Sequence, residues 1–400
     1  MRHHVSVTVL GFMLAASVAS AEPAGRVYEV APEDDYRITL RQLQPGDELR
    51  FLPGVHEGHA VIRAAGEPER PITIRGVVED GERPELRFTG RGHNLWRIRG
   101  DHLHIRDLSF HATHAYGIRV DRADDITIEN CVFRDCGGGD ISANTANVDR
   151  LHIRGCRFIG SRRTPVYIGQ HDGELDIDDF RFERNLIDGR RIEGGIGYGI
   201  QLKLNVRGGM IRDNIVFGTR GPGIMVYGAE GAQEGGQSLI ERNLVVGSRR
   251  HPGIAVGGGP AVVRHNITIA GHGDGIGVFD YGGRGMLEQI TLEGNLSALN
   301  RGHDLSIRGR IRDLTAMDNR IYHRPGGSGI RGLRASGQVS GNESTGAGSA
   351  LREVVEQVED AVPDEAAVER WIDRMNETVP DDEAALVELL QLLLEDADGD

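Results

Sequence analysis

The sequence predicts an all-β fold: a single-stranded right-handed parallel β-helix of about ten coils, followed by an acidic α-helical tail. Three observations support this prediction. A four-residue pattern recurs every 23 to 29 residues, a second apolar column stays in phase with it, and 57 glycines punctuate the chain without a collagen period. Short alternating strands that repeat at this period, with turns between them, coil into a solenoid.

The recurring pattern opens on an apolar residue in most copies and, from residue 185 onward, ends on asparagine. The final residues of its ten copies are Leu108, Cys131, Cys156, Asn185, Asn214, Asn243, Asn266, Asn295, Asn319 and Asn342. Coils of a β-helix stack at roughly 4.8 Å, and stacked amides hydrogen-bond along the axis and tolerate left-handed turn angles. The column therefore predicts an internal asparagine ladder.

The second column is aliphatic and is usually preceded by glycine. Its members are Ile118, Ile141, Val166, Ile200, Ile224, Ile254, Ile276, Leu305 and Ile330. Alternate residues of a strand face opposite sides of its sheet. We therefore expect each of these residues to point into the solenoid, with its neighbours displayed outside.

The two ends of the chain differ from this body. Residues 1–21 combine a short positive segment, an apolar run from Val5 to Val18 and the small residues Ala19-Ser20-Ala21, which is typical of a secretory signal peptide. We expect an exported protein, periplasmic or extracellular, with the β-helix over residues 22–348. No later segment approaches 18 apolar residues, so no membrane span is expected.

The acidic helical tail is predicted over residues 349–400. Residues 351–400 hold 17 Asp or Glu against 3 Arg, with Pro363 and Pro380 as expected helix boundaries. Apolar residues recur at helical spacing: Val354, Val355, Val358, Leu386, Leu389, Leu390 and Leu393. Because a solenoid needs its open end covered, we expect the tail to cap the last coil. The alternative is a tail that docks on another protein.

Charge and cysteine content exclude two classes of protein. The net charge of −14 argues against a nucleic-acid binder. Outside the tail the chain is balanced, with 43 basic and 43 acidic residues, so it can carry a local basic edge for an anionic partner. Three cysteines exclude a disulfide framework. Cys131 and Cys156 would stack on adjacent coils, and both a disulfide and two buried thiols stay open.

Lys203 is the candidate catalytic residue, because 45 of the 46 basic residues are arginine and it is the exception. With Ile200 and Leu202 inward, Lys203 faces outward, in register with Tyr227 and diagonal to His171. The pKa of lysine falls readily on burial, so it can neutralise a carboxylate or accept a proton. The competing interpretation is a lysine without a role on an exposed strand.

Other displayed residues complete a predicted substrate strip. Tyr167, Gln201 and Asn205 face outward beside Lys203, neighbouring Gly and Ala residues leave room for a ligand, and residues 189–198 would form a wall. Arginines and a histidine at similar turn positions on nearby coils would add an edge suited to carboxylate or sulfate groups: Arg162, Arg163, Arg220, Arg249, Arg250 and His251. Pairing of these arginines with local Asp or Glu is the equally open alternative.

The columns, together with residues 43–54 (LQPGDELRFLPG) and 70–76 (RPITIRG), resemble the pectin-lyase-like superfamily over about residues 26–345. The opening stretch is similar to its chondroitinase-B and alginate-lyase branch. The resemblance implies an anionic polysaccharide as partner and, in that branch, calcium as the one possible cofactor. The lyases place Lys and Arg on adjacent coils. Here Tyr227 follows Lys203, which puts direct transfer of the lyase roles in doubt.

Uronate elimination needs a cation on the carboxylate, a base for the C5 proton and an acid for the leaving oxygen. We expect Lys203 as neutraliser or base, Tyr227 as acid or base, His171 as their partner and Arg220 as a carboxylate clamp. Lys, Tyr and His together also resemble the C5-epimerases of the superfamily, although their Asp-Pro-His signature is missing. A non-catalytic glycan-binding or envelope protein is the remaining alternative.

Two further patterns carry less weight. The motifs of polygalacturonase-like members are only partly present: Asn144-Thr145 lacks the following Asp, and Asp178-Asp179 falls on another face of the coil. Paired carboxylates for glycoside hydrolysis are therefore not evident. The acidic run between Asp172 and Asp179 could hold calcium, but a solvated strand face is the favoured interpretation.

Overall fold

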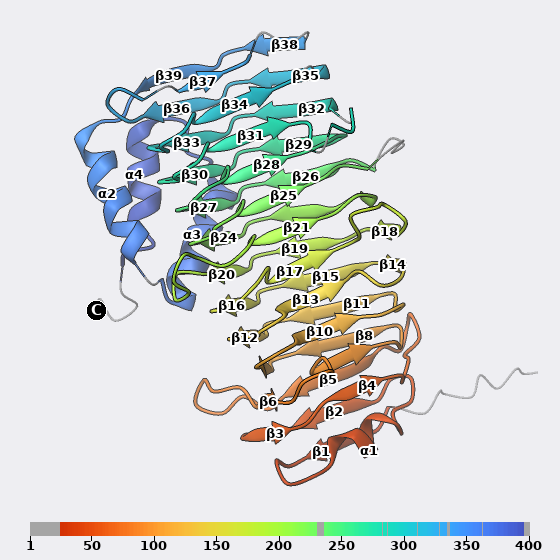
Figure 1. Cartoon of the computed structure of the whole chain (residues 1–400). Helices are drawn as coiled ribbons and strands as arrows, with labels where there is room; N and C mark the ends of the chain where they lie inside the picture. The colour runs from red at the N-terminus through yellow and green to blue at the C-terminus, as the bar shows by residue number, and fades with distance from the viewer. Residues whose placement is uncertain are drawn as a thin grey trace, which may run out of the picture.

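The computed structural model describes residues 25–229, 236–281, 283–285, 287–309, 311–327, 329–333, 337–361 and 363–395. The predicted signal peptide lies outside these residues. The described chain winds into a parallel β-solenoid with three helices along one side (Figure 1). Successive strands enter three long sheets in turn, here called A, B and C, and every neighbouring pair in them is parallel, as in β8–β11, β9–β12 and β7–β10.

Within the described residues sheet A has 13 strands, sheet B has 12 and sheet C has 11. Sheet A consists of β1 (Val27–Val30), β2 (Glu48–Phe51), β5 (Ile72–Gly76), β8 (Leu103–Arg106), β11 (Ile126–Glu129), β15 (Leu151–Arg154), β19 (Arg181–Glu183), β23 (Met210–Arg212), β26 (Ser238–Glu241), β29 (Ala261–Arg264), β32 (Glu288–Glu293), β35 (Arg312–Met317) and β38 (Gly337–Ser340). Sheet B consists of β3 (Val55–Glu57), β6 (Glu85–Phe88), β9 (Ser109–Ala112), β12 (Val132–Arg134), β16 (Arg157–Ile159), β20 (Leu186–Asp188), β24 (Ile215–Phe217), β27 (Leu244–Val246), β30 (Ile267–Ile269), β33 (Leu296–Ala298), β36 (Arg320–His323) and β39 (Glu343–Gly346).

Sheet C consists of β4 (Ala60–Ile62), β7 (Trp96–Ile98), β10 (Tyr116–Val120), β13 (Gly139–Ala143), β17 (Val166–Ile168), β21 (Ile200–Leu202), β25 (Ile224–Val226), β28 (Ile254–Val256), β31 (Ile276–Phe279), β34 (Leu305–Arg308) and β37 (Ile330–Arg331). A small fourth sheet holds β14 (Val148–Asp149), β18 (Ile177–Asp178) and β22 (Val206–Arg207). The helices are α1 (Tyr36–Leu40), α2 (Ser349–Asp360), α3 (Glu365–Glu377) and α4 (Glu383–Gln391).

The solenoid has about twelve coils, so the sequence-based count of about ten is too low. The ten copies of the four-residue pattern follow the strands of sheet A from β8 to β38. The strands β1, β2 and β5 come before the first copy and end in different turns, such as Leu52-Pro53-Gly54 after β2. The four-residue pattern includes the turn after each sheet A strand, so it cannot identify the first coils, whose turns have a different sequence.

Both predicted columns are confirmed. The aliphatic column runs in register along sheet C, as in Ile118 with Ile141 and Ile200 with Ile224. In the asparagine ladder, Asn243 accepts bonds from the backbone and side-chain nitrogens of Asn214 at 3.1 and 2.9 Å, and it donates to Asn266 at 2.9 Å. The left-handed angle falls on the residue before each asparagine, as at Asp213 and Arg242, and not on the asparagine itself.

The column continues toward the N-terminus through two cysteines that are free thiols. Cys131 and Cys156 are both fully buried, and the backbone nitrogen of Cys131 donates to Cys156 Sγ at 3.5 Å. Of the two open interpretations, the structure shows the pair of buried thiols. Burial raises the pKa of Cys131, which keeps its thiol protonated and inert.

The helical tail lies along the side of the solenoid, so the expected cap on the last coil is wrong. The outward residues of sheet B between β20 and β33 are apolar, and they form one core with the apolar faces of the helices, including Phe217, Val246, Trp371 and Leu390. The last strands, β38 and β39, stay exposed. A helix covers the surface that gains most from burial, which here is an apolar sheet face and not a polar coil end.

Details of the tail agree with the predicted boundaries. Pro363 lies between α2 and α3, and Pro380 lies between α3 and α4. Asp364 and Asp382 cap α3 and α4 by accepting hydrogen bonds from Ala367 and Ala385. Arg184, in the turn after β19, pairs with Glu369 of α3, so part of the tail's acidic charge is bound to the solenoid. No helix among the described residues is long and apolar enough to cross a membrane.

Sheet C contains a buried carboxyl group that makes stability depend on pH. Asp140 of β13 is 0% exposed, accepts a hydrogen bond from Ser161 and leaves its other oxygen without a partner. Burial raises the pKa of Asp140 from 3.8 to about 7. The folded state therefore holds a proton that the unfolded state has already released, so this group stabilises the fold at low pH and the contribution is lost as pH rises through about 7.

We expect the free energy of unfolding to fall by about 1.4 kcal/mol per pH unit from this group between pH 5 and 7. Asp140→Asn removes the ionisation, so thermal melts at pH 5, 6, 7 and 8 should show a flatter dependence than the wild type. Asp381→Asn, at an exposed position, is the control and should keep the wild-type slope. Equal slopes for Asp140→Asn and the wild type would contradict the prediction.

Candidate functional site

The candidate site is built on the outward face of sheet C, where strands β21 and β25 bring Lys203 beside Tyr227. Gln201 pairs in register with Met225, and the backbone nitrogen of Tyr227 continues the ladder by donating to Leu202 at 3.0 Å. Lys203 and Tyr227 therefore leave the sheet on the same side and on adjacent coils. This is the juxtaposition that the sequence predicts.

The ammonium group of Lys203 lies over two aromatic rings. Its Nζ is 4.3 Å from the ring centroid of Tyr227 and 5.3 Å from that of Tyr167. The residue is 7% exposed, so the interpretation of a lysine on an exposed strand is wrong. Among the residues that the structure describes, no carboxylate pairs with Nζ. The charge is held by aromatic faces, which attract a cation without neutralising it.

This environment lowers the pKa of Lys203 to about 8, because burial disfavours the charged amine and Arg284 repels it. A substantial fraction of the amine is then neutral near pH 8, and a neutral amine accepts protons. A carboxylate brought by a ligand would reverse the effect by stabilising the ammonium form. Lys203 is therefore suited to either of the two roles that the sequence suggests.

Tyr227 is placed to keep and donate a proton. It is 1% exposed, and its hydroxyl accepts a hydrogen bond from Gln201 at 3.0 Å. Burial and the neighbouring Tyr281 and Tyr198 hydroxyls raise its pKa above the usual value. A phenol in this state is a donor at neutral pH, so the geometry favours the acid role over the base role for Tyr227.

His171 and Arg284 form the margin of the site. The His171 ring is 6.3 Å from that of Tyr227 and edge-on to it. Arg284 Nη2 lies 3.3 Å from His171 Nε2 and donates to the His171 carbonyl at 3.2 Å. Sequence reasoning missed Arg284, because one arginine among 45 carries no signal and this one reaches the site from the turn after β31.

The expectation that small residues leave the strip open is wrong in part. Gly257 does provide space, but Tyr281 packs into it, and a side-chain atom added at Gly257 would lie 3.0 Å from Tyr281. Tyr281 also stacks edge-on against Tyr227 at 4.7 Å. Together with the partly buried Tyr198 and Phe279, it covers an apolar cluster that includes Met225. The strip is thus lined with aromatic rings.

Two other predicted positions have structural contacts. Asn205 turns the chain after β21 with a positive φ of 59°, and its amide donates to the Gly173 carbonyl at 2.6 Å. It therefore anchors the turn that carries His171, and no observation places it against a ligand. The predicted wall, residues 189–198, contributes Tyr198 to the aromatic cluster.

The arginine edge exists in part. The Arg249 backbone nitrogen donates to the Thr219 carbonyl, which places Arg249 beside Arg220 on adjacent coils. His251 lies near Arg220 and Arg250, and its pKa is lowered by burial and then by these two cations. Residues 189–198 lie between Arg163 and Arg220, with Gly197 against the Arg163 backbone, so Arg162 and Arg163 do not continue the stack.

Three of the five carboxylates in the acidic run beside the site form ion pairs. Asp176 and Asp178 pair with Arg207, and Asp179 pairs with Arg181. Across the described ranges, no group of three or more His, Cys, Asp or Glu side chains is arranged to hold a metal ion.

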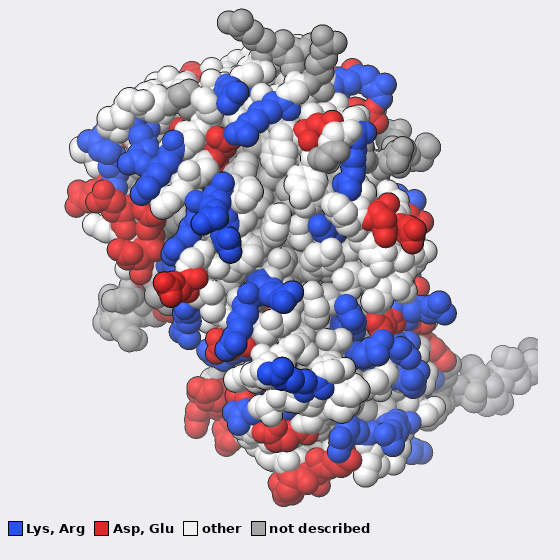
Figure 2. All heavy atoms as spheres, viewed as in Figure 1, with Lys and Arg blue, Asp and Glu red and all other residues white. Residues whose placement is uncertain are grey.

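Charge on this side of the molecule is concentrated away from the aromatic strip. Figure 2 shows a stretch with few charged atoms over β21, β25 and β28, with Lys and Arg gathered at its margins. An anionic chain approaching this face meets arginines first and an aromatic surface in the middle.

The comparisons with known proteins agree with this architecture. Residues 94–295 match the family described as the right handed beta helix region. The chain belongs to this family. The predicted right-handed parallel β-helix is thereby confirmed. None of the curated proteins matches the sequence significantly.

Solved structures of similar shape include polysaccharide lyases and epimerases. The A-module of a mannuronan C-5 epimerase from Azotobacter vinelandii is 13% identical, with 80% of this chain and 100% of that chain covered and a TM-score of 0.50. Pectate lyase Pel9A is 12% identical, with 86% of each chain covered and a TM-score of 0.50. An alginate lyase from Paenibacillus sp. is 19% identical, with 80% of this chain and 99% of that chain covered and a TM-score of 0.48. At these identities the likeness shows the fold.

Proposed function

We propose that this β-helix protein acts on a uronate-containing anionic polysaccharide by C5-proton abstraction and β-elimination. The observation that carries the proposal is the Lys203 site. A nearly buried lysine with a pKa of about 8 lies against Tyr227, which keeps its proton, on the outward face of sheet C. An amine that is partly neutral near pH 8, beside a phenol that is protonated at neutral pH, offers one group that can accept a proton and one that can deliver a proton.

The β-helix family and its polysaccharide-active neighbours in shape are consistent with this class of substrate. They do not choose the reaction, because the same fold hosts several chemistries. The choice rests on residue types: the groups that contact Lys203 are the aromatic rings of Tyr167 and Tyr227, whereas glycoside hydrolysis depends on a pair of carboxylates.

In the proposed step, neutral Lys203 takes the proton from C5 of a uronate. The electron pair forms the C4–C5 double bond, the bond from C4 to the glycosidic oxygen breaks, and Tyr227 supplies the proton that this oxygen needs. Water then returns a proton to Tyr227 and removes one from Lys203. A cation at the substrate carboxylate stabilises the charge that develops during C5 deprotonation.

Arg284 is the candidate for this cation, because it stands next to His171 and its side chain has no acidic partner among the described residues. Arg220, the clamp expected from sequence, is exposed on the turn edge and would hold a neighbouring sugar unit. The proposed step needs no calcium, because Arg284 supplies the cation at the substrate carboxylate.

The test is a release assay on alginate, glucuronan, chondroitin and pectate, with ultraviolet absorbance of the unsaturated uronate as the readout. We expect absorbance to rise with one of these polymers. The same mixtures in deuterated water, read by mass spectrometry and NMR, test the epimerase alternative. Deuterium at C5 without chain cleavage would identify epimerisation, because an epimerase returns a solvent proton to C5, whereas elimination cleaves the chain.

A non-catalytic glycan-binding function is the second candidate. The Tyr281 ring, which packs against Gly257 and fills part of the predicted open strip, favours this function. Aromatic rings at a protein surface bind sugar faces without chemistry. Binding of a polymer without absorbance and without deuterium uptake, unaffected by Lys203→Ala, would establish this function and reject the enzyme.

We also propose that the protein works outside the cytoplasm, as the signal-peptide pattern of residues 1–21 predicts. Amino-terminal sequencing of the exported protein should begin at Glu22. Although the acidic tail is bound to the solenoid, Glu residues of α2 still face solvent and the arginine edge. We propose that a further protein can dock on α2. A pull-down that compares the wild type with a variant of reduced tail charge tests this proposal.

A further inference from the structure

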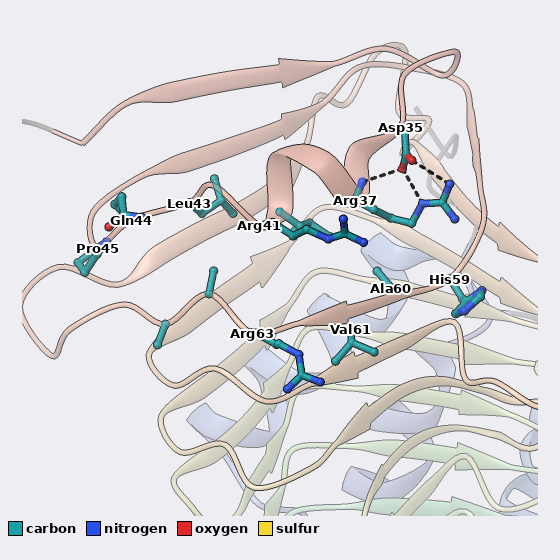
Figure 3. Close-up of a pocket in the computed structure, with 13 residues that line it drawn as sticks. Asp35, Arg37, Arg41, Leu43, Gln44, Pro45, His59, Ala60, Val61 and Arg63 are labelled. Atoms are coloured by element: carbon teal, nitrogen blue, oxygen red, sulfur yellow. Dashed lines mark hydrogen bonds and ion pairs between the residues drawn. The ribbon is translucent and has the colours of Figure 1, made fainter.

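A large basic cavity lies at the N-terminal end of sheet C, away from Lys203. It has a volume of about 980 Å³ and opens between α1 and β4. Figure 3 shows Arg37 and Arg41 on the α1 side and Val61 and Arg63 on the β4 side. Apolar atoms of Leu40, Ala60 and Val61 form part of its wall, so the cavity offers both charge and a surface for a sugar ring.

The cations of this cavity are only partly neutralised. Arg37 pairs with Asp35 through two hydrogen bonds of its guanidinium. Arg41 and Arg63 are exposed, and their side chains make no hydrogen bond or ion pair with any described residue. His59, which stacks on His93 at 4.3 Å, has its pKa lowered by burial and then by the neighbouring His93 and Arg37 side chains. Such a site attracts anions.

A second cavity of about 520 Å³ adjoins the first at Arg63, which lines both. In it Arg97 and Arg99 share the carboxylate of Asp121, while Arg122 has no acidic partner among the described residues. Four guanidinium groups, those of Arg63, Arg97, Arg99 and Arg122, and one carboxylate leave a net positive charge beside the sheet.

The register of sheet C connects these cavities to Lys203. Arg99 donates its backbone nitrogen to Ile62, which places it beside Arg63, and the same outward row continues through Asp121, Asn144 and Gly169 to Lys203. This path spans five strand steps, or about 24 Å at the usual strand spacing. An extended polymer lying along the row would reach both places.

We propose that the two cavities form a remote binding site for the carboxylates of an extended oligouronate whose reacting unit lies at Lys203. The location of the reacting unit rests on the proposed function, whereas anion binding at the cavities does not. Arginine forks match carboxylates in bidentate geometry, and the spaced arginines Arg41, Arg63 and Arg122 suit a polymer with one carboxylate per unit.

The experiment compares wild type with Arg41→Ala/Arg63→Ala, using oligomannuronate, oligoguluronate, oligogalacturonate and oligoglucuronate as probes. Calorimetry at 50 and 200 mM salt measures decasaccharide binding, and initial rates are measured on decasaccharides and trisaccharides. Arg331→Ala is the matched control, because Arg331 is exposed on β37 at the opposite end of the same sheet. Thermal melts check that each variant is folded.

We expect the double variant to bind the decasaccharide at least tenfold more weakly, with a weaker salt dependence, and to show a raised KM on it with kcat unchanged. Trisaccharide rates and the Arg331→Ala control should match the wild type. Unchanged decasaccharide affinity in the double variant overturns the inference, and so does equal binding of a decathymidylate, which would indicate a general polyanion surface.

The two proposals fail in different ways. If no probe is turned over but the double variant still loses decasaccharide binding, the elimination proposal falls and the binding site stands. If turnover is found and Lys203→Ala abolishes it, while the double variant equals the wild type on every probe, the binding site falls and the elimination proposal stands.

Discussion

Replacing Lys203 by alanine is expected to lower the rate of unsaturated-uronate release at least 100-fold, which is the usual contribution of a positioned acid or base. The residue is nearly buried, but its side chain makes no hydrogen bond or ion pair with described residues, so the melting temperature should change little. Rates on the polymer that responds in the panel measure the effect. Arg331→Ala, on the far end of the same sheet, should retain wild-type activity.

The pH profile separates the two roles of Lys203. As a base, the amine must be neutral, so the rate rises with pH and levels off above about 8, the pKa of the free protein. As a charge neutraliser, the amine must be protonated, so the rate falls above about 8. Lys203→Arg stays protonated in both cases, and it is inactive if Lys203 is the base but partly active if it neutralises the carboxylate.

The outcome that would reject a catalytic Lys203 is a variant that keeps the wild-type rate and profile. Tyr227→Phe provides an independent check, because it removes the proton donor and keeps the ring beneath the ammonium group. We expect it to lower the rate as strongly as Lys203→Ala while preserving decasaccharide affinity.

Replacing Asn243 by alanine is expected to destabilise the solenoid by roughly 3 kcal/mol, the largest single effect predicted on stability. The Asn243 amide donates to the Ile211 carbonyl and to Asn266, and its oxygen accepts from the Asn214 backbone, all without access to water. Removing it leaves buried groups unpaired and a cavity in the ladder.

Asn342→Ala is the matched control, because Asn342 ends the ladder and is partly exposed, so water can replace its bonds. We expect a loss below about 1 kcal/mol for this variant. Urea and thermal unfolding of both variants, followed by circular dichroism, measure the difference. Equal losses would show that the ladder is not stronger in the interior than at its end.

Much of the fold could be predicted from residues whose environment repeats. The column from Asn185 to Asn342 is visible because the same turn recurs, and each turn imposes the same hydrogen bonds. The first coils were missing from the predicted coil count because their turns lack the repeated pattern. The tail was predicted as helical from its 3.6-residue spacing, but its place depended on the outward residues of sheet B, such as Phe217 and Val246.

The candidate site shows the same division. The pairing of Lys203 with Tyr227 follows from the register of adjacent coils, which the aliphatic column determines. The contacts of Tyr281 with Gly257 and of Arg284 with His171 do not follow from it, because both side chains come from a turn whose path has no repeat.

The sequence by itself thus determined the β-helix, its register and the position of its one lysine, because those depend on short-range periodicity and on stacking at a constant spacing. Tertiary structure decided what surrounds that lysine: two aromatic rings that hold its charge, a pKa near 8, and a tail placed on the side of the solenoid. These features depend on which non-repeating surfaces meet, and burial against a particular neighbour has no signature in the order of residues.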